Sequence, residues 1–291
     1  MKLLSTFDYE NAVLLRDSFK LTSEITTEEE KAFCRKHKIP MMRGVLTEVD
    51  DYGNEIFVSE NTMVWSGALL TLEKVFGVKP SFKPATLNTI YGLNETLTPD
   101  VKETYCCLFG IGIGGCTMEF NTVKDASFKQ REIEGFIPMR VDSSETLTGT
   151  DAEKYHFRKD IGDGKHASYL KEFQLPTVID SRWKDSVDED VDGTEIDEEI
   201  YDSTKTELIE CYAECSLRII TKDVRSYYEA NGNLEHARFN SLGLFVGQKV
   251  EVTPGVYDYI NVNLFSVLNF ENVSVKDRAK IDYRYRIYSA Y

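Results

Sequence analysis

Apolar and polar residues alternate with a period of two along much of the C-terminal half of this chain, which is typical of strands that bury one face. In residues 281–288, aliphatic or aromatic side chains occupy the odd positions and charged ones occupy 282, 284 and 286. A strand so close to Tyr291 predicts an end anchored in a sheet, either the chain's own or a neighbouring subunit's. Because tyrosine gives contact area with a polar tip, we expect this end to form a subunit interface. The interface candidates are Tyr283, Arg284, Tyr285, Arg286, Tyr288 and Tyr291.

The same alternation is strict in residues 207–220, where Cys211 and Cys215 fall on the apolar face. A strand rises about 3.3 Å per residue, so these two cysteines would lie roughly 13 Å apart, too far for a disulfide or a shared metal ion. No CxxC pair occurs among the six cysteines. We therefore expect reduced cysteines that pack as small hydrophobic side chains.

Weaker patterns define the other expected elements. Strands are predicted at 45–58 (a hairpin with its turn at 51–54), 103–123 (a strand pair or one long kinked strand), 128–141, 242–252, 257–268 and 279–288. Helices are predicted at 26–37, 61–76 and 223–230, and loops at 78–100 and 142–165, while 166–173 is ambiguous between strand and loop. These elements predict an α+β fold that is β-dominated, with a sandwich- or barrel-like antiparallel sheet and a few peripheral helices.

The predicted elements divide the chain into a mixed α/β N-terminal region, 1–100, and a β-rich structural domain, 101–291. The second region contains an acidic loop at 184–204, within which residues 185–202 hold ten carboxylates and no basic residue. This segment supplies most of the net charge of −15. A surface of that sign repels phosphates, so we expect no sequence-specific nucleic-acid partner.

The termini and hydropathy favour a protein that matures in a cytoplasm. Asp8 and Glu10 interrupt the N-terminal apolar residues too early for a secretory signal. No run of about 20 apolar residues occurs, so we expect no membrane-spanning helix. The hydrophobic fraction of 42% is that of a globular protein.

One segment matches the spacing of a calcium-binding loop, D-x-D-x-D-G-x5-E. The matching residues are Asp188, Asp190, Asp192, Gly193 and Glu199. Carboxylates at alternate positions, a glycine for the turn and a final bidentate carboxylate suit Ca²⁺. However, the usual apolar eighth position is Glu195, and neither 176–183 nor 207–220 is an amphipathic helix. Two interpretations stay open: a Ca²⁺ site formed by Asp188, Asp190, Asp192 and Glu199, or a solvated acidic loop.

No other motif indicates catalysis. Residues 110–115 satisfy G-x-G-x-x-G, but the following CTMEF is typical of a strand, whereas a dinucleotide site requires a helix there. We expect these glycines to allow a bend, a bulge or a close backbone contact. The four histidines lack metal-binding spacing, and no G-x-S-x-G motif occurs. We therefore expect no enzyme and no cofactor other than Ca²⁺, although dispersed acid and base residues could form a site that no motif announces.

From about residue 100 to 288, a resemblance lies in the order of several segments. They are FGIGIGGCTMEF (109–120), IPMRV (137–141), YHFRKD (155–160), YLKEF (169–173), KDVRSYYEANG (222–232), ARFNSLGLFVGQ (237–248), DYINVNLFSVLNF (258–270) and DYRYRIY (282–288). Together these segments resemble structural virion proteins of tailed bacteriophages. The resemblance implies a non-catalytic ring subunit that is built into the virion in the host cytoplasm. Its partners would be copies of itself and neighbouring virion proteins.

The preferred expectation is an oligomeric ring component of the neck (the head-to-tail connector) or of the tail. One alternative is a head-associated minor capsid or decoration protein. Another, from a different class, is a calcium-binding module that uses residues 188–199.

Overall fold

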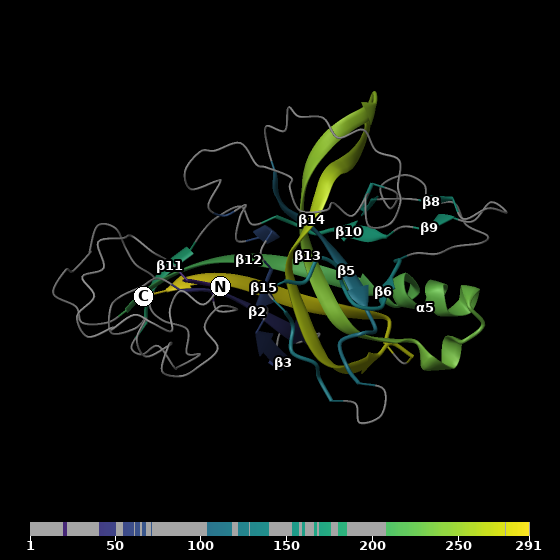
Figure 1. Ribbon diagram of the computed structural model, residues 1–291, viewed down its shortest axis with the longest axis horizontal. Coiled ribbons are helices and arrows are strands. Elements are labelled where there is room, and N and C mark those ends of the chain that lie inside the picture. Colours follow the sequence, from purple (N-terminus) through teal and green to yellow (C-terminus); the bar gives the residue numbers. More distant parts are fainter. Residues whose placement is uncertain are drawn as a thin grey trace.

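The computed structural model describes just over half of the chain. The described residues are 20–21, 41–50, 55–60, 62–64, 66–67, 71, 104–117, 122–127, 129–139, 153–156, 159–160, 166–167, 169–175, 180–184, 208–276 and 278–290. They form two large, mostly antiparallel sheets and one described α-helix (Figure 1). The expected β-dominated α+β fold is confirmed.

The first sheet, sheet A, has the spatial order β1-β2-β15-β12-β11, with β3 also paired to β2. Its strands are β1 (Lys20–Leu21), β2 (Met41–Val49), β3 (Glu55–Glu60), β11 (Asp180–Lys184), β12 (Leu208–Ile220) and β15 (Lys280–Ala290). Only the short β1–β2 pair among these described strands is parallel. The last strand, β15, pairs with β12 on one side and with β2 on the other. The predicted anchoring is therefore made by the chain's own sheet.

The second sheet, sheet B, has the order β4-β14-β13-β5-β10-β7, with β6 also paired to β5. Its strands are β4 (Thr62–Met63), β5 (Tyr105–Gly112), β6 (Phe136–Ile137), β7 (Tyr155–His156), β10 (Leu170–Glu172), β13 (Arg238–Thr253) and β14 (Val256–Ser274). A separate pair joins β8 (Lys159–Asp160) to β9 (His166–Ala167). Strands from residues 41–63 thus lie in both large sheets, beside strands of the 101–291 region.

Helix α5 (Thr221–Ala230) and a short 3₁₀ turn, η3 (Leu234–His236), lead from β12 to β13. The Asp223 carboxylate accepts a hydrogen bond from the backbone N–H of Ile220, which closes the first turn of α5. Val224 and Tyr228 lie one turn apart and face the core. Gly232, at φ +69°, lies just beyond the end of the helix, where its left-handed backbone favours glycine. The predicted helix at 223–230 is confirmed.

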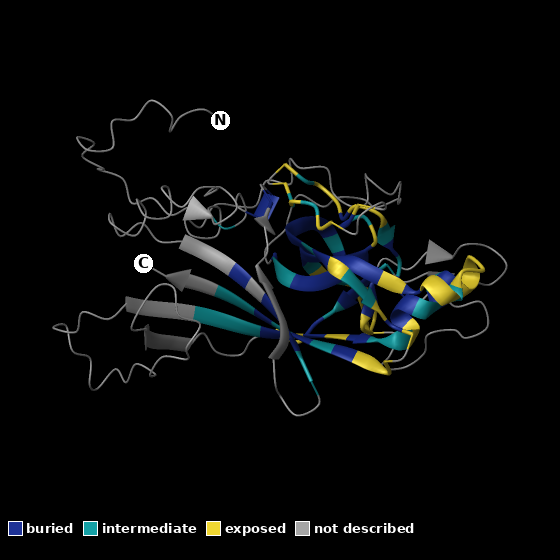
Figure 2. Ribbon diagram, turned by 90° about the horizontal axis from the view of Figure 1, so that it is seen from below, coloured by how far each residue is buried: buried dark blue, intermediate teal, exposed yellow. Residues whose placement is uncertain are grey.

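The main hydrophobic core lies between the two sheets (Figure 2). Leu217 of β12 and Tyr283 and Tyr285 of β15 contribute to it from sheet A, and Phe239 and Phe270 contribute from sheet B. A second core covers the opposite face of sheet B. Sheet B is therefore buried on both faces, whereas β12 and β15 of sheet A alternate between buried and more exposed positions. The alternation that identified these two strands in the sequence reflects their one-sided burial.

Several predicted boundaries were wrong. Of the strand pair or long kinked strand expected at 103–123, the first strand ends at Gly112, and among the described residues beyond it Cys116 and Val123 form an isolated antiparallel bridge. The strand expected at 128–141 is reduced to β6, because residues 129–135 fold back over sheet B as a loop that buries Ile133. The loop expected at 142–165 contains β7 and β8.

The N-terminal predictions had a mixed outcome. The hairpin at 45–58 is confirmed by the antiparallel pairing of β2 with β3. The helix expected at 61–76 does not start at Asn61, because Thr62 and Met63 pair with β14 as a strand. The helix expected at 26–37, the loop at 78–100 and the apolar stripe of the 61–76 helix lie outside the described residues.

Candidate functional site

The most prominent surface feature is the free end of the β13–β14 hairpin, residues 248–260, which we call the hairpin arm. Pairing of β13 with β5 ends at Gly247, so the arm continues as a two-stranded ribbon. Its turn lies at the top of Figure 1, away from sheet A. Val252, Val256 and Tyr257 near this turn are 55%, 52% and 51% exposed. Exposed apolar side chains at the end of a projecting ribbon are typical of a contact surface.

The arm turn is well defined by local contacts. Thr253 pairs with Val256 across Pro254 and Gly255, and Gly255 has a φ of +77°. The Glu251 carboxylate accepts a hydrogen bond from the Gly255 N–H at 2.7 Å. Proline fixes one φ angle of the turn and glycine supplies the positive one. Local interactions therefore define the conformation of this turn.

The arm joins the body at a bulge. The β13–β14 register shifts between the pairs Val246–Asn263 and Gln248–Ile260. Asn261 lies in this shift with a φ of +53°, a conformation that asparagine tolerates better than most residues. It is 1% exposed, and the Asn263 side chain donates a hydrogen bond to its carbonyl oxygen at 3.0 Å. The bulge is therefore a buried bend in the ribbon.

A buried histidine connects the base of the arm to the edge of sheet B. The side chain of His156, on β7, is 2% exposed. Its Nδ1 lies 3.1 Å from the Asp258 carboxylate of the arm, and its Nε2 lies 3.0 Å from the Glu172 carboxylate of β10. Lys249 of the arm is in turn 3.0 Å from Glu172. The ring of His156 also packs edge-on against Tyr259, with centroids 4.6 Å apart.

Electrostatics in this cluster favour charged partners. Burial alone would lower the pKa of His156, but the hydrogen bonds and charges of Asp258 and Glu172 outweigh burial and raise it. Burial would likewise raise the pKa of Glu172, but bonds from His156 and Lys249 lower it to about 2. Burial raises the pKa of Tyr259 and of nearby Cys107 far above neutrality, so both stay uncharged. The cluster therefore consists of charged side chains packed against side chains that stay uncharged.

A second feature is a groove of about 750 Å³ along the outer face of β12 and β15, next to β10. A ladder of cross-strand charges lies on this outer face and lines part of the groove. Arg218 binds Asp282 at 2.5 Å, and Arg286 binds Glu214 at 2.6 Å while its guanidinium lies 5.2 Å from the ring centre of Tyr212. The register places these partners directly opposite each other. Cross-strand pairs of this kind stabilise a sheet modestly.

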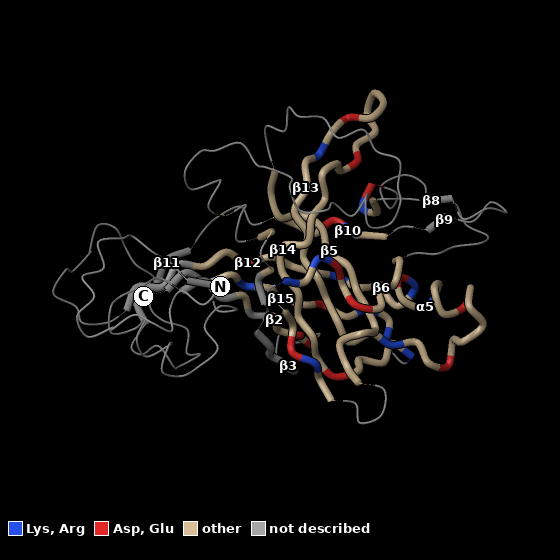
Figure 3. The backbone as a smooth tube through the Cα atoms, in the orientation of Figure 1, with Lys and Arg blue, Asp and Glu red and all other residues tan. Residues whose placement is uncertain are grey.

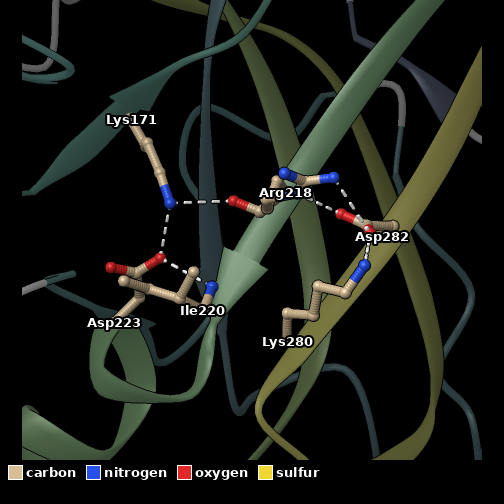
Figure 4. Close-up of polar contacts among 6 residues, drawn as sticks. All are labelled: Lys171, Arg218, Ile220, Asp223, Lys280 and Asp282. Carbon is tan, nitrogen blue, oxygen red and sulfur yellow. Dashed lines mark hydrogen bonds and ion pairs between the residues drawn. The ribbon is translucent and has the colours of Figure 1, made fainter. Parts of the chain in front are cut away.

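At the end of the groove, a buried ion pair joins the two sheets (Figure 4). Lys171 of β10 donates to the Asp223 carboxylate at 2.7 Å and to the Arg218 carbonyl at 2.9 Å. Tyr155 of β7 donates to the same carboxylate at 2.6 Å. Asp223 is fully buried, and its oxygens accept bonds from β7, β10 and Ile220, the last residue of β12. With its partners satisfied in this way, the pair has the geometry of a structural joint between the sheets.

The proposed interface at the C-terminal strand needs a correction. Tyr283 and Tyr285 are 2% and 1% exposed and pack in the core, so their rings are not available to a neighbour. Their expected burial is confirmed. Arg284 and Arg286 lie on the opposite, outer face, where Glu214 is their common partner. Only the backbone of Tyr288 is described, in register with Tyr212, and Tyr291 lies outside the described residues.

The candidate calcium ligands Asp188, Asp190, Asp192 and Glu199 lie outside the described residues. Within the described part, no group of three or more histidine, cysteine or acidic side chains is arranged to hold a metal ion. In the His156 cluster, for example, the two carboxylates contact different ring nitrogens. No described helix is long and apolar enough to cross a membrane.

The glycines at 110–115 allow close backbone contact, as expected. A Cβ on Gly115 would lie 2.1 Å from the carbonyl oxygen of Asn240, and one on Gly114 would lie 2.4 Å from Cβ of Glu134. The Gly115 N–H also donates to the Asn240 side chain at 2.7 Å. No helix begins at residues 113–117, so the helix that a dinucleotide site needs does not follow the strand there.

The described cysteines are reduced, as expected. Cys106, Cys107, Cys116 and Cys215 are free thiols. Burial raises the pKa of Cys215 to about 11, which keeps its thiol protonated and unreactive at neutral pH. The side chain of Cys211 is not among the described ones.

The sequence did not point to the His156 cluster or to the Lys171–Asp223 pair. Each joins residues from strands far apart in the chain, and β7 is only two residues long. A single histidine in a polar segment carries no spacing signal, so nothing in the sequence could identify its partners. Comparison of the chain with family models, with curated proteins and with solved structures finds no match.

Proposed function

We propose that this chain is a structural subunit that assembles with copies of itself in the virion of a tailed bacteriophage, as a ring component of the neck or tail. The observation that carries the proposal is the hairpin arm with its exposed Val252, Val256 and Tyr257. The reason for proposing a phage particle is the resemblance of segments between residues 100 and 288 to virion structural proteins. A second copy of the chain is the partner that we assign to the arm.

Charge favours a second copy at the outer face of sheet A. The chain has a net charge of −15, so two copies repel each other over most of their surfaces. The outer face of β12 and β15 differs, because its described side chains include the four basic residues Arg218, Lys280, Arg284 and Arg286 and the two acidic residues Glu214 and Asp282. A face with excess positive charge attracts an acidic copy.

The arm has a composition that suits this face. Beside its apolar tip it carries Lys249, Glu251 and Asp258, and both signs of charge occur along it in Figure 3. An arm of one copy against the outer face of the next is a heterologous contact, because two different surfaces meet. Repeated contacts of this kind close into a ring when the rotation between copies allows it. The same geometry would serve a head-associated subunit, which differs in copy number and position.

The test compares oligomer size in arm variants and in matched surface variants of the full chain. We expect the wild-type chain to form a ring-sized oligomer in sedimentation velocity and in negative-stain images. The triple change Val252→Ser, Val256→Ser and Tyr257→Ser should give a folded monomer. The control Ile113→Ser with Leu175→Ser alters two other exposed apolar residues, each 38% exposed, and should assemble normally.

Two results would contradict the proposal. One is a wild-type chain that stays monomeric at micromolar concentration, and the other is an arm variant that assembles as the wild type does. The virion location has a separate test, which is mass spectrometry of purified particles. Peptides of the chain at a constant ratio to the major capsid protein support it, and their absence from particles opposes it.

A further inference from the structure

The base of the hairpin arm is tied to the edge of sheet B by two polar contacts, which a third contact links to each other. Asp258 of β14 contacts His156 of β7 at 3.1 Å, and Lys249 of β13 contacts Glu172 of β10 at 3.0 Å. Glu172 also lies 3.0 Å from His156. Both strands of the arm are thus fixed to β7 and β10 through a single chain of side chains: Asp258, His156, Glu172 and Lys249.

The geometry of this chain requires a protonated imidazole. Both ring nitrogens of His156 face carboxylate oxygens at hydrogen-bond distance. A carboxylate only accepts hydrogen bonds, so each nitrogen must donate, and only the imidazolium cation carries a proton on both nitrogens. A neutral ring would keep one bond and turn a lone pair toward the other carboxylate. It could not hold β10 and β14 together.

We propose that His156 is a pH-dependent latch for the hairpin arm, closed when the imidazole is protonated and open when it is neutral. The hinge of the arm is the bulge at Asn261, where the β13–β14 register shifts. The latch lies on the arm side of this bulge, because Asp258 and Lys249 both lie between the bulge and the arm turn. Release would therefore loosen residues 248–260, which the Lys249–Glu172 ion pair and the buried Tyr259 ring would still hold, and would leave the rest of sheet B paired. The inference concerns the arm whatever its partner is, and so it stands apart from the proposed assembly.

The direction of the pH effect follows from the surroundings of His156. The raised pKa of His156 means that the latch contributes its full stability below the ordinary value of 6.5 and loses it as pH rises through the folded value. The lowered pKa of Glu172 means that its contribution is lost only as pH falls from 4.5 toward about 2. Lys249 carries the other charge that faces the cluster, while Tyr259 and Cys107 stay neutral. The latch is therefore closed in mildly acidic solution and opens on the alkaline side.

Hydrogen exchange of the full chain tests the latch. Protection factors of arm amides, corrected for the intrinsic effect of pH, are compared at about pH 5.5 and about pH 9, since histidine titrates between them. Protection in residues 248–260 should fall at the higher pH by about tenfold for each unit by which folding raises the pKa of His156. Protection of β12, residues 208–220, is the internal reference and should not change.

Two variants and one control assign the effect. His156→Gln cannot carry a charge, so its arm should show low protection at both pH values. Asp258→Asn removes one charge from a side chain that is 39% exposed, and should reduce the pH response without unfolding the protein. His236→Gln makes the same exchange at an exposed histidine of η3 and should respond as the wild type does. A proton NMR titration of His156 in the wild type gives its pKa directly.

Three outcomes would overturn the latch. The first is equal arm protection at both pH values in the wild type. The second is a wild-type pH response that persists in either His156→Gln or Asp258→Asn. The third is an equal loss of protection in β12, which would mean that the whole protein, and not the arm, loosens.

Discussion

Asp223 accepts hydrogen bonds from strands of both sheets. Its carboxylate accepts bonds from Lys171, Tyr155 and the Ile220 N–H, and none of its surface is exposed to solvent. Each partner comes from a different element, which makes one side chain responsible for the relative position of β10, β7 and α5. A buried carboxylate with three donors is stable as a unit, but its removal leaves an ammonium group without its charge partner.

We predict that Asp223→Ala lowers the free energy of unfolding by about 3–5 kcal/mol, because Lys171 stays buried and uncompensated. The control is Glu229→Ala on the same helix, where the ion pair with Arg225 is 3.5 Å long and exposed. This change should cost less than about 0.5 kcal/mol. Urea denaturation measures both values. Equal costs for the two variants would contradict the structural role of Asp223.

The same substitution, to aspartate, made separately at two neighbouring residues of β12 compares the two faces of this strand. Cys215 is 7% exposed and belongs to the main core, so Cys215→Asp buries an unpaired charge and should cost at least about 3 kcal/mol. Ser216 is exposed and lies opposite Arg284 in the register, so Ser216→Asp should change stability by less than about 0.5 kcal/mol. Thermal melts measure the difference, and similar shifts would show that the register of β12 is wrong.

The acidic loop stays a prediction from the sequence, because its residues lie outside the described ones. As a solvated loop it should tolerate Asp190→Asn together with Asp192→Asn. We then expect no rise in melting temperature on adding Ca²⁺ at about 1 mM, a concentration that would fill a weak extracellular-type site. A rise that EDTA reverses and that the double variant lacks would instead establish the calcium-binding interpretation.

At the scale of elements, β15 is central to sheet A. It pairs with β12 and with β2 along almost its whole length, and its inward side chains include Tyr283 and Tyr285. Removing it would not merely expose an edge, because β2 and β3 would lose their connection to β12. This position gives the strand more influence on the fold than a terminal strand at a sheet edge would have.

We predict that deletion of residues 282–291 abolishes cooperative unfolding and gives an aggregating chain, because β2 and β12 both lose a paired neighbour. The control deletes only residues 290–291, which removes one terminal pair from each of the two ladders. It should keep the native circular dichroism spectrum and melt cooperatively. A cooperative melt in the longer deletion would refute the central position of β15.

The sequence predicts strands well where one face is buried and the other is exposed to solvent. Strands β12 and β15 are predicted for this reason. The prediction failed where strands are short, and it placed the ends of β13 and β14 that lie away from the turn at 242 and 268 instead of 238 and 274. Nothing in the alternation marks the end of β5 at Gly112, because the loop after it is held by backbone contacts with Glu134 and Gly135. The clusters at His156 and Asp223 depend on strand order, which periodicity does not encode.

At the scale of the whole molecule, the net charge opposes association of copies, whereas the shape of the surface favours it. A net charge of −15 keeps copies apart, while the hairpin arm and the outer face of sheet A offer surfaces on which they can meet. Repulsion between whole molecules acts over a long range, and salt screens it before it weakens a desolvated contact. Assembly should therefore depend on ionic strength in a definite direction.

We predict that raising NaCl from about 20 mM to about 300 mM promotes assembly, because the screening length falls from roughly 20 Å to under 6 Å. Sedimentation velocity should show a shift from monomer to oligomer. The triple arm variant is the control and should stay monomeric throughout. An oligomer that dissociates as salt is added would mean that ion pairs, not the apolar tip, hold the copies together.

The order of strands in sheet A also has a consequence for synthesis. The register pairs Met41 with Ala290, so one neighbour of β2 is translated long after β2 itself. At about 5–20 residues per second, β2 and β3 wait for tens of seconds on the ribosome before β15 emerges. During that time a hairpin with an unsatisfied edge is available to chaperones or to nascent chains nearby. Substitutions in β2 that leave the purified protein stable should therefore still lower its yield in cells.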